Sequence, residues 1–165
     1  MNTPKWIIAH FSPTGGTKRV ADAIAAGFSV PVEEMDLTVA DSAVTLGEHD
    51  GLMAVLPVFA GRVPQIALER LETRDAMEAN GFRVIAGAAF IAEHSMHRSI
   101  AAGRPDAQDE ALCRRFAADV MAKADDAAPV QVPGNTPYKE LKPSAFHPAA
   151  NETCTKCGTC SEGCP

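Results

Sequence analysis

Residues 6–17 read WIIAHFSPTGGT, and this stretch decides the fold. Its first half, 6–11, is a continuous apolar run that is typical of a buried strand, and its second half, 12–17, is a polar loop containing two glycines. The helix predicted from about Thr17 has one apolar face, made of Val20, Ala21, Ile24 and Phe28. A buried strand, a loop and an amphipathic helix in this order predict the first unit of an α/β fold.

The same alternation continues along the first 128 residues. Further strands are predicted at 32–37, 52–56 and 82–90, with a weaker fifth candidate at 99–102. Two more helices are predicted, one beginning at Pro64 with Ile66, Leu68 and Leu71 on its apolar face, and one beginning at Pro105-Asp106 with Leu112, Phe116 and Val120. Continuous apolar strands between helices predict an open parallel sheet of four to five strands, with helices on both faces.

The composition narrows the possible partners. The chain has 165 residues with 15 Lys or Arg and 21 Asp or Glu, so its formal net charge is −6. Nucleic acids and anionic membranes favour a basic surface, so we expect neither as a partner. No apolar run approaches the roughly 18 residues of a membrane span, and no signal peptide is recognisable. We therefore expect a cytoplasmic protein, and the sequence leaves its oligomeric state open.

The chain is expected to have three parts. Residues 1–128 form the α/β domain. The segment 129–150 contains Pro129, Pro133, Pro137, Pro143 and Pro148 and no helical periodicity, which predicts an extended linker. Residues 151–165 are rich in cysteine and predict a short metal-binding segment.

The loop 12–17 has the composition of a phosphate site. Ser12, Thr14 and Thr17 offer hydroxyl groups, and Gly15 and Gly16, next to Pro13, allow backbone amides to approach an anion at a helix N-terminus. The glycine patterns of a dinucleotide-binding fold and of a P-loop are both absent. The alternative is an ordinary turn with no ligand.

Four cysteines crowd into the last twelve residues. Cys154, Cys157, Cys160 and Cys164 have the spacing Cys-x2-Cys-x2-Cys-x3-Cys-Pro of bacterial ferredoxins, which predicts ligands of a [4Fe–4S] cluster. A zinc knuckle is the alternative. Either Cys164 closes one local cluster or the sequence is a fragment of a longer protein, and we favour the fragment, with an incomplete or absent cluster in these 165 residues. The fifth cysteine, Cys113, is expected to be a buried structural thiol.

The pattern Ser-x-Thr-Gly-x-Thr resembles the FMN phosphate loop of flavodoxins. Together with the cysteine run, it resembles the flavodoxin–ferredoxin fusion proteins of anaerobic bacteria. The strings PVFAGRVP, EHS, GRPD and VPGN, which begin at residues 57, 93, 103 and 132, are also similar to that family. The resemblance covers nearly the whole chain and implies a flavodoxin-like FMN domain with appended iron–sulfur clusters. The main departure is that no second cysteine run follows.

The resemblance also implies which other residues contact the flavin. Two segments would line the isoalloxazine: Val58, Phe59, Ala60 and Gly61 after the third strand, and Ala88, Ala89 and Phe90 at the end of the fourth. Phe59 would stack on the ring or belong to the core. Glu93 and His94 would contact the flavin or a partner or move a proton, or else lie in a solvated loop. Lys18 is expected to point to solvent rather than to the phosphate.

The function expected from these features is electron transfer between FMN and iron–sulfur clusters in anaerobic metabolism, with a redox protein as partner. In a carrier of this kind, no residue has to act as an acid, a base or a nucleophile. The alternative is an FMN-dependent reductase of a small acceptor such as a quinone. A third possibility is a non-redox binding module with a zinc knuckle.

Overall fold

The computed structural model describes residues 5–39, 50–59, 61–71, 83–124, 127–130 and 149–158. The chain divides into two compact units, Met1–Val130 and Gln131–Pro165. The linker expected at 129–150 lies outside the described residues except at its two ends.

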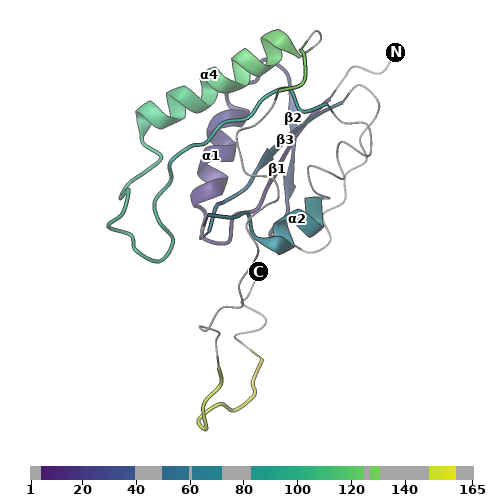
Figure 1. The fold of residues 1–165 in the computed structure, drawn as a ribbon. Helices are drawn as coiled ribbons and strands as arrows, with labels where there is room; N and C mark the ends of the chain where they lie inside the picture. Colours follow the sequence, from purple (N-terminus) through teal and green to yellow (C-terminus); the bar gives the residue numbers. More distant parts are fainter. Residues whose placement is uncertain are drawn as a thin grey trace. The chain divides into compact units, whose positions relative to one another are not determined.

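The first unit is a small α/β fold built on a three-stranded parallel sheet (Figure 1). Its strands are β1 (Trp6–His10), β2 (Val32–Asp36) and β3 (Gly51–Val55), in the order β2-β1-β3. β1 pairs with both neighbours in parallel along its whole length. All three strands lie within one residue of their predicted bounds, so the predicted α/β class and parallel sheet are confirmed.

The fourth and fifth predicted strands are not confirmed. Residues 83–90 have no regular secondary structure, residue 82 lies outside the described part, and the candidate at 99–102 is a turn. The amide of Val130 donates to the carbonyl of Val84 at 2.9 Å, which joins two segments at one point but does not make a ladder. Gly87, Ala88 and Ala89 are exposed, and such small side chains give a strand little to pack.

Helices cover both faces of the sheet. Figure 1 shows α1 (Gly16–Ala25) and α4 (Ala107–Lys123) on one face and α2 (Gln65–Leu71) on the other. α2 begins directly after Pro64, as predicted, and its predicted end at 80–81 lies outside the described residues. None of the described helices combines the length and apolar character that crossing a bilayer requires.

The core has two halves because neighbouring residues of β1 point to opposite faces of the sheet. Ile8 packs with α1 and α4, while Ala9 and the following Phe11 pack with α2 and with Leu37. Buried members of the first half are Ile8, Val20, Ala21, Ala23, Ile24, Val55, Cys113 and Ala117. Those of the second half are Ala9, Phe11, Leu37 and Ala67.

The buried face of α4 agrees with the prediction at Val120 and Cys113 and differs from it at Leu112. Leu112, expected inside, is 58% exposed, whereas Cys113 and Ala117 are fully buried. The reason is the close approach of α4 to the end of α1: a Cβ on Gly27 would lie 2.3 Å from the carbonyl oxygen of Arg114. Only small side chains fit between backbones at such a distance, so the helix turns its larger Leu112 outward.

The same preference for a small side chain appears in α2. Ala67 is fully buried in the second half of the core. Its neighbour Ile66, predicted on the apolar face, is instead exposed.

Candidate functional site

The carboxyl ends of the three parallel strands meet at one edge of the sheet. Loop 12–17 follows β1, residues 37–39 follow β2, and the segment beginning at Leu56 follows β3. β1 connects through α1 to β2 on one side, while β3 lies on the other side of β1. The helix that follows β1 (α1) and the helix that follows β3 (α2) lie on opposite faces of the sheet (Figure 1), and such a switch point is where open α/β sheets bind ligands.

Loop 12–17 turns sharply into α1. Gly15 is the N-cap of the helix with φ +81°, a left-handed conformation that glycine adopts without strain, and its amide donates to the carbonyl of Ser12 at 3.2 Å. The amide of Lys18 donates to the hydroxyl oxygen of Ser12 at 2.8 Å. Ser12, three residues before the N-cap Gly15, therefore accepts a hydrogen bond from the first turn of the helix. In most helices the side chain of the N-cap residue itself has this role.

The loop leaves several donors available at the helix N-terminus. Pro13, Thr14 and Gly15 are exposed. Among the described residues, neither the amide groups of Gly16 and Thr17 nor the hydroxyl groups of Thr14 and Thr17 have a hydrogen-bond partner. These donors, together with the positive end of the helix dipole, can hold an anion.

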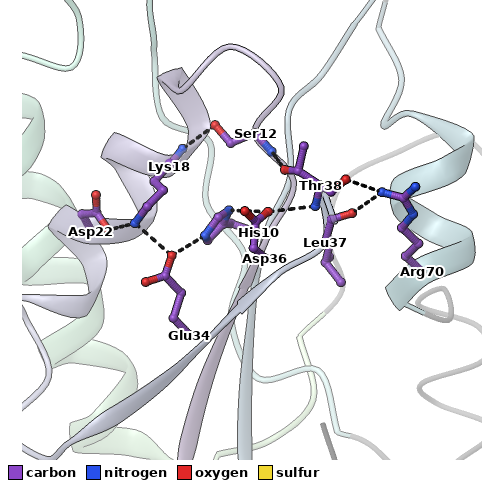
Figure 2. A network of polar contacts seen from close by, with 9 residues as sticks. All are labelled: His10, Ser12, Lys18, Asp22, Glu34, Asp36, Leu37, Thr38 and Arg70. Carbon is purple, nitrogen blue, oxygen red and sulfur yellow. Dashed lines mark hydrogen bonds and ion pairs between the residues drawn. The ribbon is translucent and has the colours of Figure 1, made fainter. Parts of the chain in front are cut away.

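Lys18 does not contribute its charge to the loop. Its ammonium lies 2.7 Å from a carboxylate oxygen of Asp22 and 2.9 Å from one of Glu34, and the side chain is 41% exposed (Figure 2). The hydrogen bonds that Lys18 donates to Asp22 and then to Glu34 raise its pKa. Any anion in the loop would therefore be held by hydroxyl and amide groups.

A buried histidine continues this network beneath the loop. His10, the last residue of β1, is 1% exposed, and its Nε2 lies 2.7 Å from Glu34 while its Nδ1 lies 3.7 Å from a carboxylate oxygen of Asp36. Hydrogen bonds with Lys18 and then His10 lower the pKa of Glu34. Burial pushes the pKa of Asp36 upward, but hydrogen bonds from the hydroxyl and amide of Thr38 outweigh it, so the pKa is lowered.

A second chain of contacts runs from the loop to α2. The amide of Ser12 donates to the hydroxyl oxygen of Thr38 at 2.9 Å. The guanidinium of Arg70 donates to the carbonyls of Leu37 and Thr38, each at 2.7 Å. Figure 2 shows these contacts as one continuous network from Asp22 in α1 to Arg70 in α2.

Sequence reasoning gave His10, Thr38 and Arg70 no role in the site. The sequence of β2 contains a clue to the role of His10. Glu34 and Asp36 stand two residues apart and so place two carboxylates on one face of the sheet. Asp36 is the register partner of His10.

The segment after β3 makes a tight turn. Phe59 and Arg62 exchange two backbone hydrogen bonds, of 2.7 and 3.0 Å, around Gly61, which has φ +79°. Phe59 is 43% exposed and Val58 is also exposed, so neither belongs to the core. Both side chains are accessible to a ligand. Ala60 lies outside the described residues.

Residues 88–90, which are predicted to contact the flavin, are followed by a segment that lies next to loop 12–17. Ala88 and Ala89 are exposed, while Phe90 packs its ring edge-on against Phe116 at a centroid distance of 5.6 Å. A Cβ on Gly16 would lie 3.7 Å from the Cβ of Ala92 and 3.9 Å from the carbonyl oxygen of Glu93. The structure therefore places residues 92–93 next to the start of α1.

The side chains of Glu93 and His94 bind their own loop. The Glu93 carboxylate accepts from the amide of Gly103 at 2.9 Å and lies 3.6 Å from the guanidinium of Arg98. His94 Nδ1 accepts from the amides of Met96 and His97 at 3.2 and 3.0 Å, which places the proton of the neutral ring on Nε2. Both side chains therefore shape the segment that carries them.

A junction around Arg104 ties this segment to two helices. The carbonyl of Arg104 accepts from the amide of Glu93 at 3.0 Å, and Arg19 of α1 donates to the carbonyls of Arg104 and Pro105 at 3.4 and 2.6 Å. The guanidinium of Arg104 forms a two-pronged ion pair with Asp109 of α4. The strings that begin at residues 93 and 103 thus meet in space.

The second unit contains two of the four predicted metal ligands among its described residues. Cys154 and Cys157 are exposed, whereas Cys160 and Cys164 lie outside the described part. Lys156 and Gly158 have φ values of +56° and +84°, so the backbone turns twice near the thiols. Within the described ranges, no three His, Cys, Asp or Glu side chains are grouped to hold a metal ion.

The remaining cysteine lies in the first unit. Cys113 is fully buried between α1 and α4, and burial raises the pKa of its thiol. A raised pKa keeps the thiol protonated and unreactive at neutral pH.

Comparisons of the chain with models of protein families, with curated proteins and with solved structures found no match.

Proposed function

We propose that the first unit binds FMN, with the phosphate in loop 12–17, and that the chain passes electrons between FMN and a [4Fe–4S] cluster. The observation that carries the proposal is the set of available amide and hydroxyl donors in loop 12–17, located at the switch point between β1 and β3. A flavodoxin-like arrangement around this three-stranded sheet is part of the same proposal.

The loop offers the donors that the phosphate of FMN requires. Ser12, Thr14 and Thr17 would donate their hydroxyl hydrogens, and Gly16 and Thr17 would donate their amides. Ser12 keeps this capacity because its oxygen, and not its hydrogen, is used in the bond from Lys18. The lysine is paired with two carboxylates, so the site would bind the phosphate through neutral donors and the helix dipole.

The flavin ring would extend from the phosphate along the carboxyl edge of the sheet. Val58 and Phe59 would cover one part of it, with Gly61 in the turn that follows, and the prediction for Ala60 stands on the sequence. On the other side, the backbone of residues 88–90 would approach the ring, because Ala88 and Ala89 have small exposed side chains.

The cluster would be held by Cys154, Cys157, Cys160 and Cys164 as thiolates. Their ferredoxin spacing and the positive φ values of Lys156 and Gly158 support this assignment, because a chain that places successive thiolates around one cluster must turn tightly between them. When bound, FMN exchanges one or two electrons and the cluster exchanges one. The chain's own residues bind and orient the two groups.

The contacts of Glu93 and His94 are compatible with a carrier, in which neither side chain has to touch a substrate. Both side chains accept hydrogen bonds from backbone amides of the loop 94–103, which is a structural role that a carrier requires no less than a reductase does and that needs no substrate. A reductase of a quinone or similar acceptor remains the second candidate. It would turn over that acceptor with a reduced nicotinamide or dithionite as electron source, whereas a carrier would pass electrons to a redox protein.

The test is an anaerobic absorbance spectrum of the purified chain, with FMN added, before and after dithionite. We expect flavin bands that bleach on reduction and, where the cluster is loaded, a broad iron–sulfur shoulder that also bleaches. Flavin bands without the shoulder would support the FMN site and leave the cysteine run unloaded. A chain that retains no FMN after gel filtration would contradict the proposal.

A further inference from the structure

We propose that Thr38 is a positioning residue that makes loop 12–17 selective for a phosphorylated flavin over riboflavin. The inference rests on the proposed FMN site. Thr38 lies two residues beyond the end of β2, and its hydroxyl oxygen accepts the amide hydrogen of Ser12 at 2.9 Å. Thr38 therefore acts on the loop through Ser12 and is not itself one of the proposed phosphate donors.

The bond to Thr38 fixes the first residue of the loop. The Ser12 amide is bound by Thr38, and the Ser12 hydroxyl oxygen is bound by the amide of Lys18 at 2.8 Å. With the backbone and the side-chain oxygen both held, the hydroxyl hydrogen is the free part of Ser12. A phosphate oxygen is the acceptor that this hydrogen would meet at the mouth of the loop.

Thr38 is itself held on two sides. Its amide donates to a carboxylate oxygen of Asp36 at 2.8 Å, and its carbonyl accepts from Arg70 at 2.7 Å. The same guanidinium nitrogen bonds the carbonyl of Leu37, whose amide donates to the carbonyl of His10 at 2.7 Å. Figure 2 shows Thr38 between Ser12 and Arg70. A hydroxyl held in this way is a rigid reference point for the loop.

The selectivity follows from where these contacts lie. Thr38 touches the residue that begins the phosphate loop, while the segments proposed to contact the flavin ring, at 58–61 and 88–90, are separate parts of the chain. Loss of the Thr38 acceptor would free the Ser12 amide and let the loop shift. Ligands with a phosphate would then bind more weakly, and a ligand without one would be unaffected.

The experiment compares Thr38→Val, which keeps the shape but removes the acceptor, with Thr38→Ser, which keeps the hydroxyl. Dissociation constants for FMN and for riboflavin are measured on the full chain by quenching of flavin fluorescence. We expect Thr38→Val to weaken FMN binding roughly fivefold to tenfold and to leave riboflavin binding unchanged, since the Ser12 amide loses its acceptor and Asp36 loses the hydroxyl donor that helps to orient that acceptor. Thr38→Ser should bind both ligands as the wild type does.

Two outcomes would overturn the inference alone: wild-type FMN affinity in Thr38→Val, or an equal loss for FMN and riboflavin, which would indicate a general disturbance of the fold. A wild-type chain that binds no FMN would overturn the proposed function, and the inference with it. If Thr38→Val fails to fold, Arg70→Lys provides the answer. In this variant an ammonium replaces the planar guanidinium that binds the carbonyls of Leu37 and Thr38. The preference for FMN over riboflavin should therefore fall, as it is expected to do in Thr38→Val.

Discussion

Glu34 is bound by two groups that come from different elements, the ammonium of Lys18 in α1 and the ring of His10 in β1. These contacts, that of Lys18 first, hold the pKa of Glu34 below its ordinary value of 4.5. A carboxylate with a lowered pKa in the folded state adds stability above the unfolded pKa, and this stability is lost as the pH falls through the folded pKa. Glu34 is half exposed, so water screens the pair.

We therefore expect Glu34→Gln to lower the free energy of unfolding at pH 7 by about 0.2–1 kcal/mol, the range of an exposed ion pair. The difference from the wild type should shrink as the pH falls below about 4.5, because the wild-type carboxylate becomes protonated. Urea unfolding at a series of pH values measures both effects. The matched control is Glu34→Gln in a Lys18→Met background, where the cost should be smaller. A difference that is the same at pH 7 and pH 2 would contradict this account.

Gly27 sets the distance between α1 and α4. A Cβ at this position would lie 2.3 Å from the carbonyl oxygen of Arg114 and 2.8 Å from the Cβ of Ala117. Backbone atoms cannot swing aside as a long side chain would, so Gly27→Ala should force the helices apart. We expect a loss of roughly 1–3 kcal/mol in stability, measured as a fall in melting temperature.

The control for this substitution is Gly16→Ala, where the nearest atoms to a new Cβ lie at 3.7 and 3.9 Å. The added methyl group makes ordinary contacts there, and the melting temperature should stay close to that of the wild type. Equal melting temperatures for Gly27→Ala and the wild type would show that the two helices can separate at no cost.

Helix α4 begins with a capping box. The side chain of Asp106, its N-cap, accepts from the amides of Gln108 and Asp109, and Asp109 accepts in return from the amide of Asp106. Asp109 also binds the guanidinium of Arg104, and this bond is the main cause of its lowered pKa. The start of α4 is thus fixed both to itself and to the segment before it.

We expect Asp106→Ala to reduce stability by about 1 kcal/mol, because two amides at the helix start lose their acceptor. Asp106→Asn should keep most of that stability, since its side-chain carbonyl is also a good cap. Chemical unfolding of the two variants under identical conditions makes the comparison. If alanine and asparagine are equivalent at this position, the capping box does not contribute as the geometry implies.

The elements differ in how well the sequence predicts them. β1 and β3 are found because apolar runs of strand length are a local signal. The face of α4 is predicted in part: Val120 and Cys113 are buried as expected, but Leu112 is exposed, because the close approach at Gly27, about 90 residues earlier in the chain, favours small side chains there. Loop 12–17 is predictable from its own composition, whereas Thr38 and Arg70 join the network through contacts between residues 26 to 33 positions apart.

On the scale of the whole molecule, the two units carry different proposed cofactors. Every residue proposed to bind FMN lies in Met1–Val130, and the four proposed cluster ligands lie in Gln131–Pro165. The assignments are therefore separable. A substitution in one unit should remove one cofactor and spare the other.

We expect the double variant Cys154→Ser, Cys157→Ser to hold less iron after anaerobic reconstitution than the wild type, even where the wild type holds an incomplete cluster, while its FMN content stays the same. The control is Cys113→Ala, which removes a buried thiol from the first unit and should leave the iron content unchanged. Iron analysis and flavin absorbance are measured on the same samples. Wild-type iron content in the double variant would exclude these two thiols as ligands.

The segment between Glu93 and Arg104 is closed at its base by backbone contacts. The amides of Glu93 and His94 donate to the carbonyls of Arg104 and Ile100, at 3.0 and 3.1 Å, while Arg98 at the tip is highly exposed. These hydrogen bonds, and not only the chain around the tip, therefore hold residues 93–94 to residues 100–104. A protease that cuts after Arg98 would leave two fragments that still elute as one species, and the same position offers a place to open the chain for a circular permutation or an inserted reporter domain.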